Sequence, residues 1–365
     1  MNQIYIEKLI EKMKEAGLDA MLISPSAEMK FFIGASPMQC ERFQGLFVKA
    51  DGEMFYVCNL LYGGEMEHLL PETIPVYTWF DGEVMSEVVG KVLEEKGLKG
   101  KKIGVDSAAQ AFNILDLMEN AGVTFVNAKL LFEEVRIHKT HEELDGLRAA
   151  AHLVDEVFSE VLGFVRPGMT EQDVKDFLFN KMTERGGYDL WAIVACGPNG
   201  SYPHYTGSSR TIEEKDVLLM DFGCTLNNMC ADMTRTVFIG DATDREKELY
   251  RIVRASQEAA EAMVKEGAFV PNIDAAAREV LGEFGYAETL INRVGHGIGY
   301  MIHEQPEIKA SNPRKLEKGM AFSIEPGIYL AGDIGIRIED IVVINENGER
   351  EILNKSTKEM IILKN

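Results

Sequence analysis

Four acidic residues in the second half of the chain lie inside apolar sequences, where carboxylates are uncommon. Asp221 follows the run VLLM, and Asp232 lies within the next apolar segment, CADMTRTVFIG. Glu325 lies within AFSIEPGIY, and Glu339 lies within GIRIED. Carboxylates are depleted in strands and are rarely buried without a partner. We therefore interpret the four acids as candidates for chemistry.

The spacing of these acids predicts two pairs, each across a hairpin. Side chains facing each other across two strands approach within about 5.5 Å, and two carboxylates at that distance repel unless a proton or a cation lies between them. Any one of these acids alone would more often be a solvated or capping residue. Four together carry the charge that two divalent cations neutralise, and oxygen donors with one imidazole and no thiolate favour Mn²⁺, Fe²⁺ or Co²⁺.

The imidazole comes from the segment VGHGIGYMIHEQP, which contains His296 and His303. The glycines here do not have the G-x-G-x-x-G spacing of a dinucleotide-binding loop, and no second histidine completes an H-E-x-x-H zinc helix. Pro306 would also interrupt a helix at this point. A segment that brings a nitrogen ligand to a centre built elsewhere is the remaining interpretation.

The composition excludes several classes of partner. The chain has 365 residues and a net charge of −21, so nucleic acid and anionic lipid surfaces are not expected partners. No apolar run reaches the roughly 18 residues of a membrane helix, and the N-terminus lacks the pattern of a signal peptide. The five cysteines include no C-x-x-C pair. These features predict a cytoplasmic protein with reduced thiols.

Two domains with different patterns are expected. Residues 1–128 alternate helices with strands, including a hairpin turned at Asp51-Gly52, and predict an α/β domain. Residues 135–365 begin with two helices that Thr140 and Thr170 are expected to cap. Antiparallel strands follow, with helices near 243–265 and 273–284, so the second domain is expected to be α+β.

The motifs DFG, ADMTRT, GHGIG with the following HE.P, EPGIY and GIRIED, in this order, resemble the pita-bread metallopeptidases. The chain is most similar to the prolidase and aminopeptidase P branch of that family. The resemblance implies an N-terminal creatinase-like α/β domain followed by a pita-bread catalytic domain. It also implies a homodimer and two divalent metal ions per chain, with Mn²⁺ expected and Co²⁺, Fe²⁺ or Zn²⁺ as alternatives.

The resemblance assigns a role to each candidate residue. The implied metal ligands are Asp221, Asp232, His296, Glu325 and Glu339. Glu325 would also move the proton, and the glycines around His296 would let the backbone pass close to the metals. His204 and His303 would contact the substrate and stabilise the reacting carbonyl. Arg337 would lie beside the site, and Asn292 stands where the family usually has a histidine, on the substrate side.

The activity implied by the resemblance is hydrolysis of the bond between an N-terminal residue and proline in a small Xaa-Pro peptide, by a dinuclear metal-bound hydroxide. An aminopeptidase acting on longer Xaa-Pro peptides is one alternative. An inactive binding protein on the same scaffold is another. A dipeptidase should also anchor a free carboxylate with a cation. Lys309, Arg314 and Lys315 could do so, or they could form a solvated basic cluster.

Overall fold

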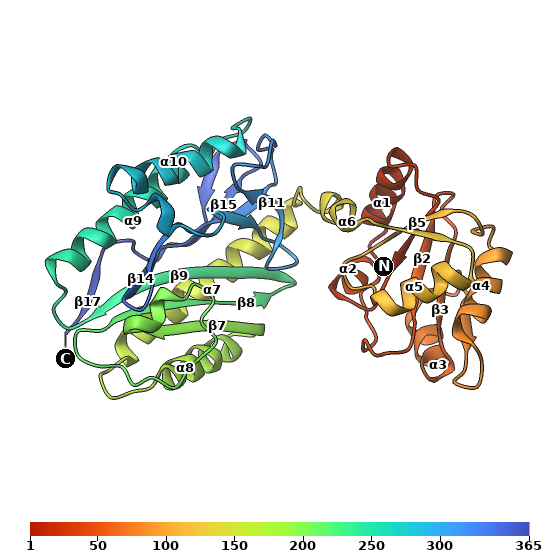
Figure 1. Ribbon diagram of the computed structural model, residues 1–365, viewed down its shortest axis with the longest axis horizontal. Coiled ribbons are helices and arrows are strands. Elements are labelled where there is room, and N and C mark those ends of the chain that lie inside the picture. Colours follow the sequence, from red (N-terminus) through yellow and green to blue (C-terminus); the bar gives the residue numbers. More distant parts are fainter. Residues whose placement is uncertain (365) are drawn as a thin grey trace. The chain divides into compact units, whose positions relative to one another are not determined.

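The computed structural model describes residues 1–364, which form two compact units, Met1–Arg136 and the chain from Ile137 onward. The helix α6 (Lys129–Val135), between the two domains expected from the sequence, belongs to the first unit. We describe each unit separately (Figure 1).

The N-terminal unit is built on a six-stranded mixed sheet with the order β4-β3-β2-β1-β5-β6. Its strands are β1 (Ala20–Ile23), β2 (Gly45–Lys49), β3 (Met54–Asn59), β4 (Val76–Trp79), β5 (Lys102–Val105) and β6 (Thr124–Asn127). Its other helices are α1 (Gln3–Glu15), α2 (Ala27–Ile33), α3 (Leu60–Leu69), α4 (Met85–Glu95) and α5 (Ala111–Asn120). The β2–β3 hairpin turns at Gly52, whose φ of +90° suits glycine.

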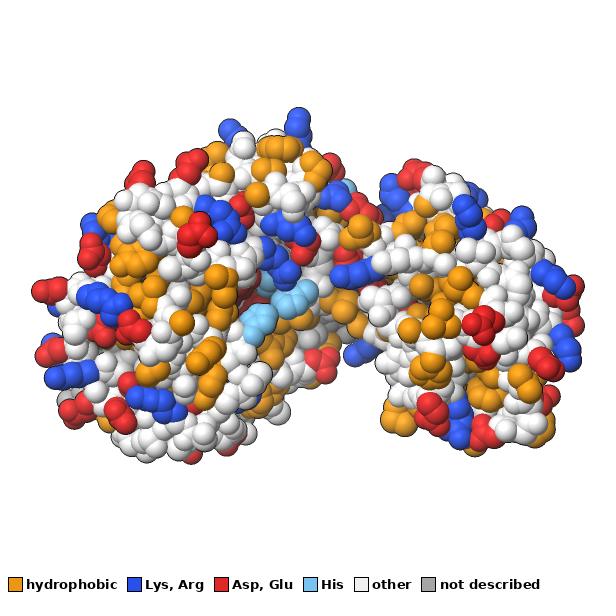
Figure 2. All heavy atoms as spheres, in the orientation of Figure 1, with side chains coloured by type: hydrophobic (Ala, Val, Ile, Leu, Met, Phe, Trp, Pro, Cys, Tyr) orange, Lys and Arg blue, Asp and Glu red, His pale blue; other side chains and the backbone are white. Residues whose placement is uncertain are grey.

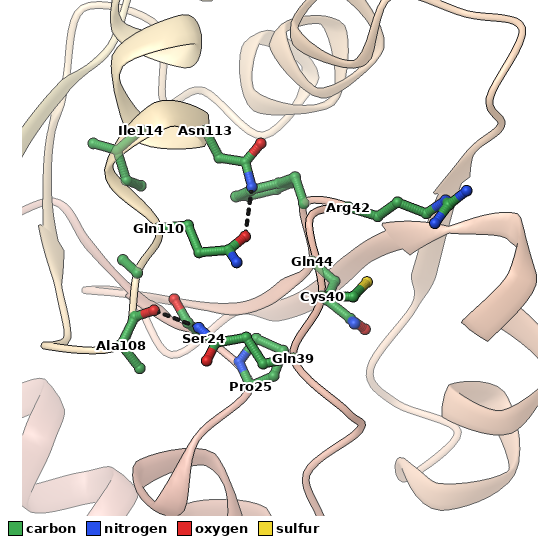
Figure 3. A pocket seen from close by; sticks show the side chains of 12 residues that line it. Ser24, Pro25, Gln39, Cys40, Arg42, Gln44, Ala108, Gln110, Asn113 and Ile114 are labelled. Carbon is green, nitrogen blue, oxygen red and sulfur yellow. Dashed lines mark hydrogen bonds between the residues drawn. The ribbon is translucent and has the colours of Figure 1, made fainter.

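A small polar pocket lies at the ends of β1 and β5 in this unit (Figure 3). The side chain of Gln39 donates to the carbonyl of Ala108 at 2.7 Å, and Asn113 donates to Gln110 at 3.1 Å. The cavity has a volume of about 20 Å³, room for about one water molecule. It is too small for a peptide substrate.

The second unit contains three antiparallel or mixed sheets. The four-stranded sheet contains β17 (Ile361–Leu363), β9 (Met229–Ile239), β8 (Val217–Leu226) and β7 (Tyr188–Cys196), in that order. The five-stranded sheet contains β11 (Glu304–Ile308), β10 (Gly295–Gly297), β12 (Ala321–Ile324), β15 (Asp340–Ile344) and β16 (Arg350–Ile352). A two-stranded ribbon joins β13 (Gly327–Leu330) to β14 (Ile334–Arg337).

Four long helices accompany these sheets: α7 (His141–Phe164), α8 (Glu171–Glu184), α9 (Asp244–Ala262) and α10 (Val270–Glu283). Two short 3₁₀ helices, η1 (Gly197–Ser201) and η2 (Ala287–Thr289), complete the described elements of this unit. Thr140 and Thr170 cap α7 and α8 in complete capping boxes with Glu143 and Asp173, as the sequence predicted.

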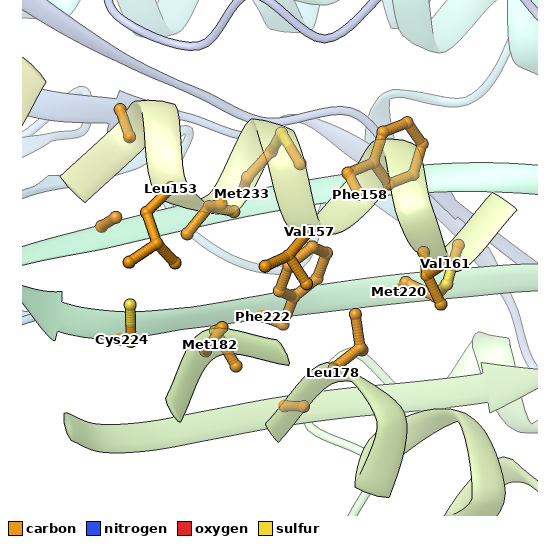
Figure 4. Packing of buried hydrophobic residues seen from close by; sticks show 14 of the residues in the cluster. Leu153, Val157, Phe158, Val161, Leu178, Met182, Met220, Phe222, Cys224 and Met233 are labelled. Atoms are coloured by element: carbon orange, nitrogen blue, oxygen red, sulfur yellow. The ribbon is translucent and has the colours of Figure 1, made fainter. Parts of the chain in front are cut away.

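The two faces of the four-stranded sheet have opposite characters. Met220, Phe222 and Cys224 of β8 are fully buried and belong to the apolar cluster formed with α7 and α8 (Figure 4). Because side chains alternate along a strand, Asp221 and Gly223 point to the opposite face. The helices therefore stabilise one face of this sheet and leave the other face free to carry polar groups.

The segments containing Glu325 and Glu339 pair with each other as the two sides of the predicted hairpin, but neither is one continuous strand. Each segment is divided into two strands, with β12 and β13 on either side of Glu325 and β14 and β15 on either side of Glu339. Pro326 has no N–H and cannot continue the strand ladder of β12. The two glutamates thus lie where the chain passes from one sheet to another.

Among residues 1–364, no helix is both long enough and apolar enough to cross a bilayer. All five cysteines are free thiols, and four of them are buried.

Candidate metal centre

Strand register places the two aspartates on one face of the β8–β9 hairpin. Asp221 pairs with Thr234, and Gly223 pairs with Asp232. Asp221 and Gly223 are two residues apart on β8, as Asp232 and Thr234 are on β9, so all four share one face. The hairpin predicted for this pair is confirmed, with the two carboxylates on a diagonal rather than directly opposite each other.

The two glutamates approach the same face from the second sheet. The register of β12 and β15 pairs Ile324 with Asp340, so Glu325 and Glu339 follow at the end of this ladder. The backbone N–H of Glu339 donates to the carbonyl of Thr234 on β9 at 3.1 Å. This bond joins the end of the five-stranded sheet to the four-stranded sheet where the acids meet.

His296 lies on β10, and its two glycine neighbours are required by packing. A Cβ atom on Gly295 would lie 1.9 Å from the carbonyl oxygen of Ser323, and one on Gly297 would lie 2.3 Å from the backbone of Gln305. The glycines therefore allow this segment to approach the adjacent strands closely. That they also let the backbone pass close to the metals stays a prediction. The Nε2 atom of His296 is 3.2 Å from Glu325 Oε1.

Arg337 and Thr234 engage one oxygen of each of two site carboxylates. Arg337 Nη2 donates to Asp221 Oδ2 at 2.6 Å, and Thr234 Oγ1 donates to Glu339 Oε2 at 2.7 Å. Arg337 also donates through Nε to Thr234 Oγ1 at 2.8 Å and through Nη1 to the hydroxyl of Tyr329 at 2.8 Å. Within residues 1–364, the second oxygens of Asp221 and Glu339 are buried without a hydrogen-bond partner.

The electrostatics of this group favour a cation. Burial raises the pKa of Glu325 to about 7. Burial, followed by the charges of neighbouring acids, raises the pKa values of Asp232 and Glu339 well above the ordinary range. Burial lowers the pKa of His296 to about 4, which keeps its imidazole neutral. A neutral imidazole among repelling carboxylates is the donor set that a divalent cation stabilises.

Three of these side chains already have the spacing of metal ligands. One potential donor atom from each of Asp232, His296 and Glu339 lies within 4.8 Å of the others. The unpartnered oxygens of Asp221 and Glu339 and the carboxylate of Glu325 add further oxygen donors around this group. The site thus has oxygen ligands and one nitrogen ligand, which fits hard or borderline divalent ions.

The acids lie in a cavity of about 970 Å³ in the second unit. All the sequence-predicted site residues line it: His204, Asp221, Asp232, Asn292, His296, His303, Glu325, Arg337 and Glu339. The ring of His303 meets the ring of His296 edge to face, with centroids 4.3 Å apart. Figure 2 shows histidine, lysine and arginine side chains at the mouth of a hollow with acidic groups inside it.

Part of the cavity wall, including Arg293 and Glu307, was not predicted from the sequence. Arg293 Nη1 lies 3.1 Å from Glu307 Oε1, and Lys309 also pairs with Glu307. All three residues line the cavity, as do Trp191 and Ile302. Of the suggested carboxylate anchors, Lys309 alone is among the described lining residues. The opposite charges two residues apart, at Glu307 on β11 and at Lys309 just after it, were the available signal, but they did not distinguish the cavity from solvent.

Comparison with known proteins assigns both units. Residues 145–346 match the model of metallopeptidase family M24, and residues 6–138 match the creatinase/prolidase N-terminal domain. The chain belongs to metallopeptidase family M24. The predicted pita-bread fold with its creatinase-like N-terminal domain is confirmed.

Several M24 proteins are similar to this chain over almost its whole length. The probable dipeptidase PepE of Mycobacterium tuberculosis is 34% identical over 96% of this chain and 93% of its own length. The Xaa-Pro dipeptidase of Pyrococcus furiosus is 29% identical over 98% of this chain and 99% of its own length. The crystal structure of a prolidase from Thermococcus sibiricus matches with a TM-score of 0.91 at 30% identity, covering 98% of each chain.

Proposed function

We propose that this M24 metallopeptidase is an Xaa-Pro dipeptidase that uses two divalent metal ions to hydrolyse the bond before a C-terminal proline. The observation that carries the proposal is the group of buried carboxylates with unpartnered oxygens around one neutral histidine, inside a cavity. Relatives named Xaa-Pro dipeptidase and prolidase over the full length of the chain support the same activity.

The proposed metal ligands are those that the resemblance implied. Asp221 would bind one ion, Asp232 and Glu339 would bridge the two, and His296 and Glu325 would complete the second. When bound, such ions polarise a carbonyl group and make water a nucleophile near neutral pH. Mn²⁺ is the ion we propose, because the donor set is rich in oxygen and has no thiolate.

The remaining side chains act on the substrate. Glu325 can take up a proton and pass it to the proline nitrogen as the bond breaks. His204 and His303 line the cavity and can donate hydrogen bonds to the developing oxyanion. Arg337 keeps Asp221 in place through its 2.6 Å bond. Asn292, whose buried Oδ1 has no partner among the described residues, can accept a substrate N–H.

One observation favours a second candidate, an aminopeptidase that accepts longer Xaa-Pro peptides. The cavity of about 970 Å³ lies at the upper end of the range of about 300–1,000 Å³ for sites that enclose drug-sized ligands. A dipeptide would leave part of this space unfilled. The bound length therefore depends on which lining residues meet the C-terminal end of the substrate, and Arg293, Glu307 and Lys309 are charged candidates for this contact.

A hydrolysis panel tests both candidates. The protein is depleted of metal, loaded with Mn²⁺, Co²⁺ or Zn²⁺, and given an Xaa-Pro dipeptide, the same peptide extended by one residue, and a matched Xaa-Ala dipeptide. The dipeptidase predicts the highest kcat/KM for the Xaa-Pro dipeptide. Equal or higher values for the longer peptide would assign the aminopeptidase instead. Cleavage of none of them by metal-loaded protein would favour an inactive binding protein.

The assembly and location are also proposals. We propose a homodimer in the cytoplasm, in keeping with the resemblance and with the free thiols. Sedimentation equilibrium at micromolar concentration measures the first, and cell fractionation measures the second.

A further inference from the structure

Trp191 lies in register with a candidate metal ligand, two strands away in the four-stranded sheet. It lies on β7 and pairs in register with Gly223 of β8, which in turn pairs with Asp232 of β9. Register partners share a face of a sheet, so the side chain of Trp191 and the carboxylate of Asp232 project on the same side. Between them is a residue without a side chain, and the indole can therefore lie across the middle strand.

The indole ring packs closely over Gly223 and fills the space that a side chain there would occupy. A Cβ atom on Gly223 would lie 2.2 Å from Trp191 Cζ2 and 2.7 Å from Cε2. The same atom would lie 1.9 Å from the carbonyl oxygen of Ala231. Any side chain at position 223 would displace the indole, so the glycine and the tryptophan form a matched pair.

Across this gap the indole reaches a candidate bridging ligand. Trp191 Nε1 donates to Asp232 Oδ1 at 3.4 Å, a long hydrogen bond. The other oxygen, Oδ2, lies 3.7 Å from His296 Nε2. The indole N–H is a donor only, so it requires an acceptor oxygen at this place. One oxygen of Asp232 is thus engaged by the indole, while the other lies nearest to His296.

We propose that Trp191 is a positioning residue of the metal centre: its indole N–H fixes the orientation in which Asp232 presents its two oxygens to two cations. This inference rests on the proposed metal ligands. Groups that hydrogen-bond to metal ligands set their orientation, and their loss typically weakens metal binding by about 10–100-fold. The ring itself also forms part of the cavity wall, so a substitution should remove the N–H and keep a ring.

The chain offers a matched control because it has only two tryptophans. Trp79 lies in the N-terminal unit, is 8% exposed, and donates to the carbonyl of Phe43 at 3.1 Å. Trp191→Phe and Trp79→Phe are therefore the same chemical change at two places, one beside the proposed ligands and one in the other unit. Each variant also leaves a single tryptophan whose fluorescence can be followed.

The first measurement is the dissociation constant for Mn²⁺ by equilibrium dialysis of chelator-treated protein. We expect Trp191→Phe to weaken Mn²⁺ binding by about tenfold or more, while Trp79→Phe leaves it unchanged. The melting temperature of the metal-free protein should change no more in Trp191→Phe than in the control. An unchanged Mn²⁺ dissociation constant in Trp191→Phe, with normal binding by the wild type, would overturn the inference and leave the metal ligands standing.

The second measurement uses Co²⁺, whose unpaired electrons and visible absorption quench nearby tryptophan emission. In Trp79→Phe the emission of Trp191 should fall and saturate at about two ions per chain, and in Trp191→Phe the emission of Trp79 should not respond. Saturating Co²⁺ without any change in Trp191 emission would overturn the inference even if Trp191→Phe failed to fold. A wild-type protein that binds neither ion would instead refute the metal centre, and this inference with it.

Discussion

Glu339 and Asp340 are neighbours in the chain, and both carboxylates are almost completely buried, but they face different surroundings. Glu339 faces the cavity, where one of its oxygens accepts from Thr234 and the other has no partner among the described residues. Asp340 points to the other side, where Arg235 donates to Oδ1 at 2.6 Å and Lys358 Nζ lies 3.0 Å from Oδ2. The second carboxylate is neutralised by the protein itself.

The pKa values of the two groups differ in direction for the same reason. Burial raises the pKa of Glu339, and the nearby charge of Glu325 raises it further. Burial also acts on Asp340, but Arg235 and Lys358 outweigh it and hold its pKa below the ordinary value. A buried carboxylate paired with protein cations contributes to stability, whereas a buried carboxylate beside other acids is stabilised by binding a proton or a metal ion. This difference in surroundings separates Glu339, a proposed metal ligand, from its neighbour Asp340.

The largest loss of activity should come from substituting a carboxylate of the proposed metal centre. Asp232→Asn removes one proposed bridging charge, and we expect kcat/KM to fall by more than the roughly 10–100-fold typical of outer partners of a ligand. The unfolding free energy of the metal-free protein should not decrease, because a repelling charge is lost. Peptide hydrolysis, metal content and chemical denaturation in chelator measure these quantities. Full activity of Asp232→Asn would refute the metal centre.

Substitution of Asp340 should have the opposite result: a loss of stability with metal binding retained. Asp340→Asn leaves Arg235 buried without its counter-ion, and breaking such a pair costs about 3–5 kcal/mol of unfolding free energy. The protein that remains folded should bind metal with the wild-type stoichiometry. Urea denaturation and metal analysis of the folded fraction test this, with Glu339→Gln as the matched neighbour. Loss of metal from a fully stable Asp340→Asn protein would contradict the distinction between the two regions.

Substituting a residue that contacts the substrate should lower activity less than substituting a metal ligand and should leave the metal in place. His303→Ala should lower kcat by about 10²–10³-fold if its ring stabilises the oxyanion, with metal content unchanged. His204→Ala should behave in the same way. His138→Ala is the control, because its ring pairs with Glu317 on the exposed surface. Release of a metal ion from His303→Ala would make His303 a ligand and would revise the proposed set.

The smallest effect is a pH dependence of the metal-free protein. The pKa of Glu325 is raised to about 7 from 4.5, so the stability it contributes is complete below pH 4.5 and is lost as the pH rises through 7. The pKa of His296 is lowered from 6.5 to about 4, and its contribution is constant above pH 6.5. Between pH 6.5 and 8 the unfolding free energy should therefore fall by about 1 kcal/mol from Glu325 alone. The raised pKa values of Asp232 and Glu339 act in the same direction.

Denaturation in chelator at several pH values measures this slope, and excess Mn²⁺ should reverse it, because protons and metal compete for the same ligands. Asp340 provides the internal contrast. Its pKa is lowered from 3.8, so its contribution is lost only as the pH falls below that value, outside this window. Metal-free stability that rises between pH 6.5 and 8 would contradict the view that the site carboxylates repel one another.

Local patterns were enough to predict many of the elements. The capping boxes at Thr140 and Thr170, the turn at Gly52 and the β8–β9 hairpin depend on residues close together in the chain, and all are confirmed. The predicted site residues came from short motifs with a family resemblance. That they line one cavity is a fact of the structure, while their individual roles stay predictions for the experiments above.

What the sequence could not supply depends on contacts between distant segments. Glu339 and Asp340 contact different partners. Glu339 accepts from Thr234, whereas Asp340 pairs with Arg235 and Lys358. These partners come from other segments of the chain. The indole of Trp191 reaches Asp232 only because three strands align around Gly223. Residue types and their order were sufficient to predict a metal centre. Tertiary structure decided which buried acids are neutralised by protein cations, because neutralisation requires a cation within a few ångströms in space.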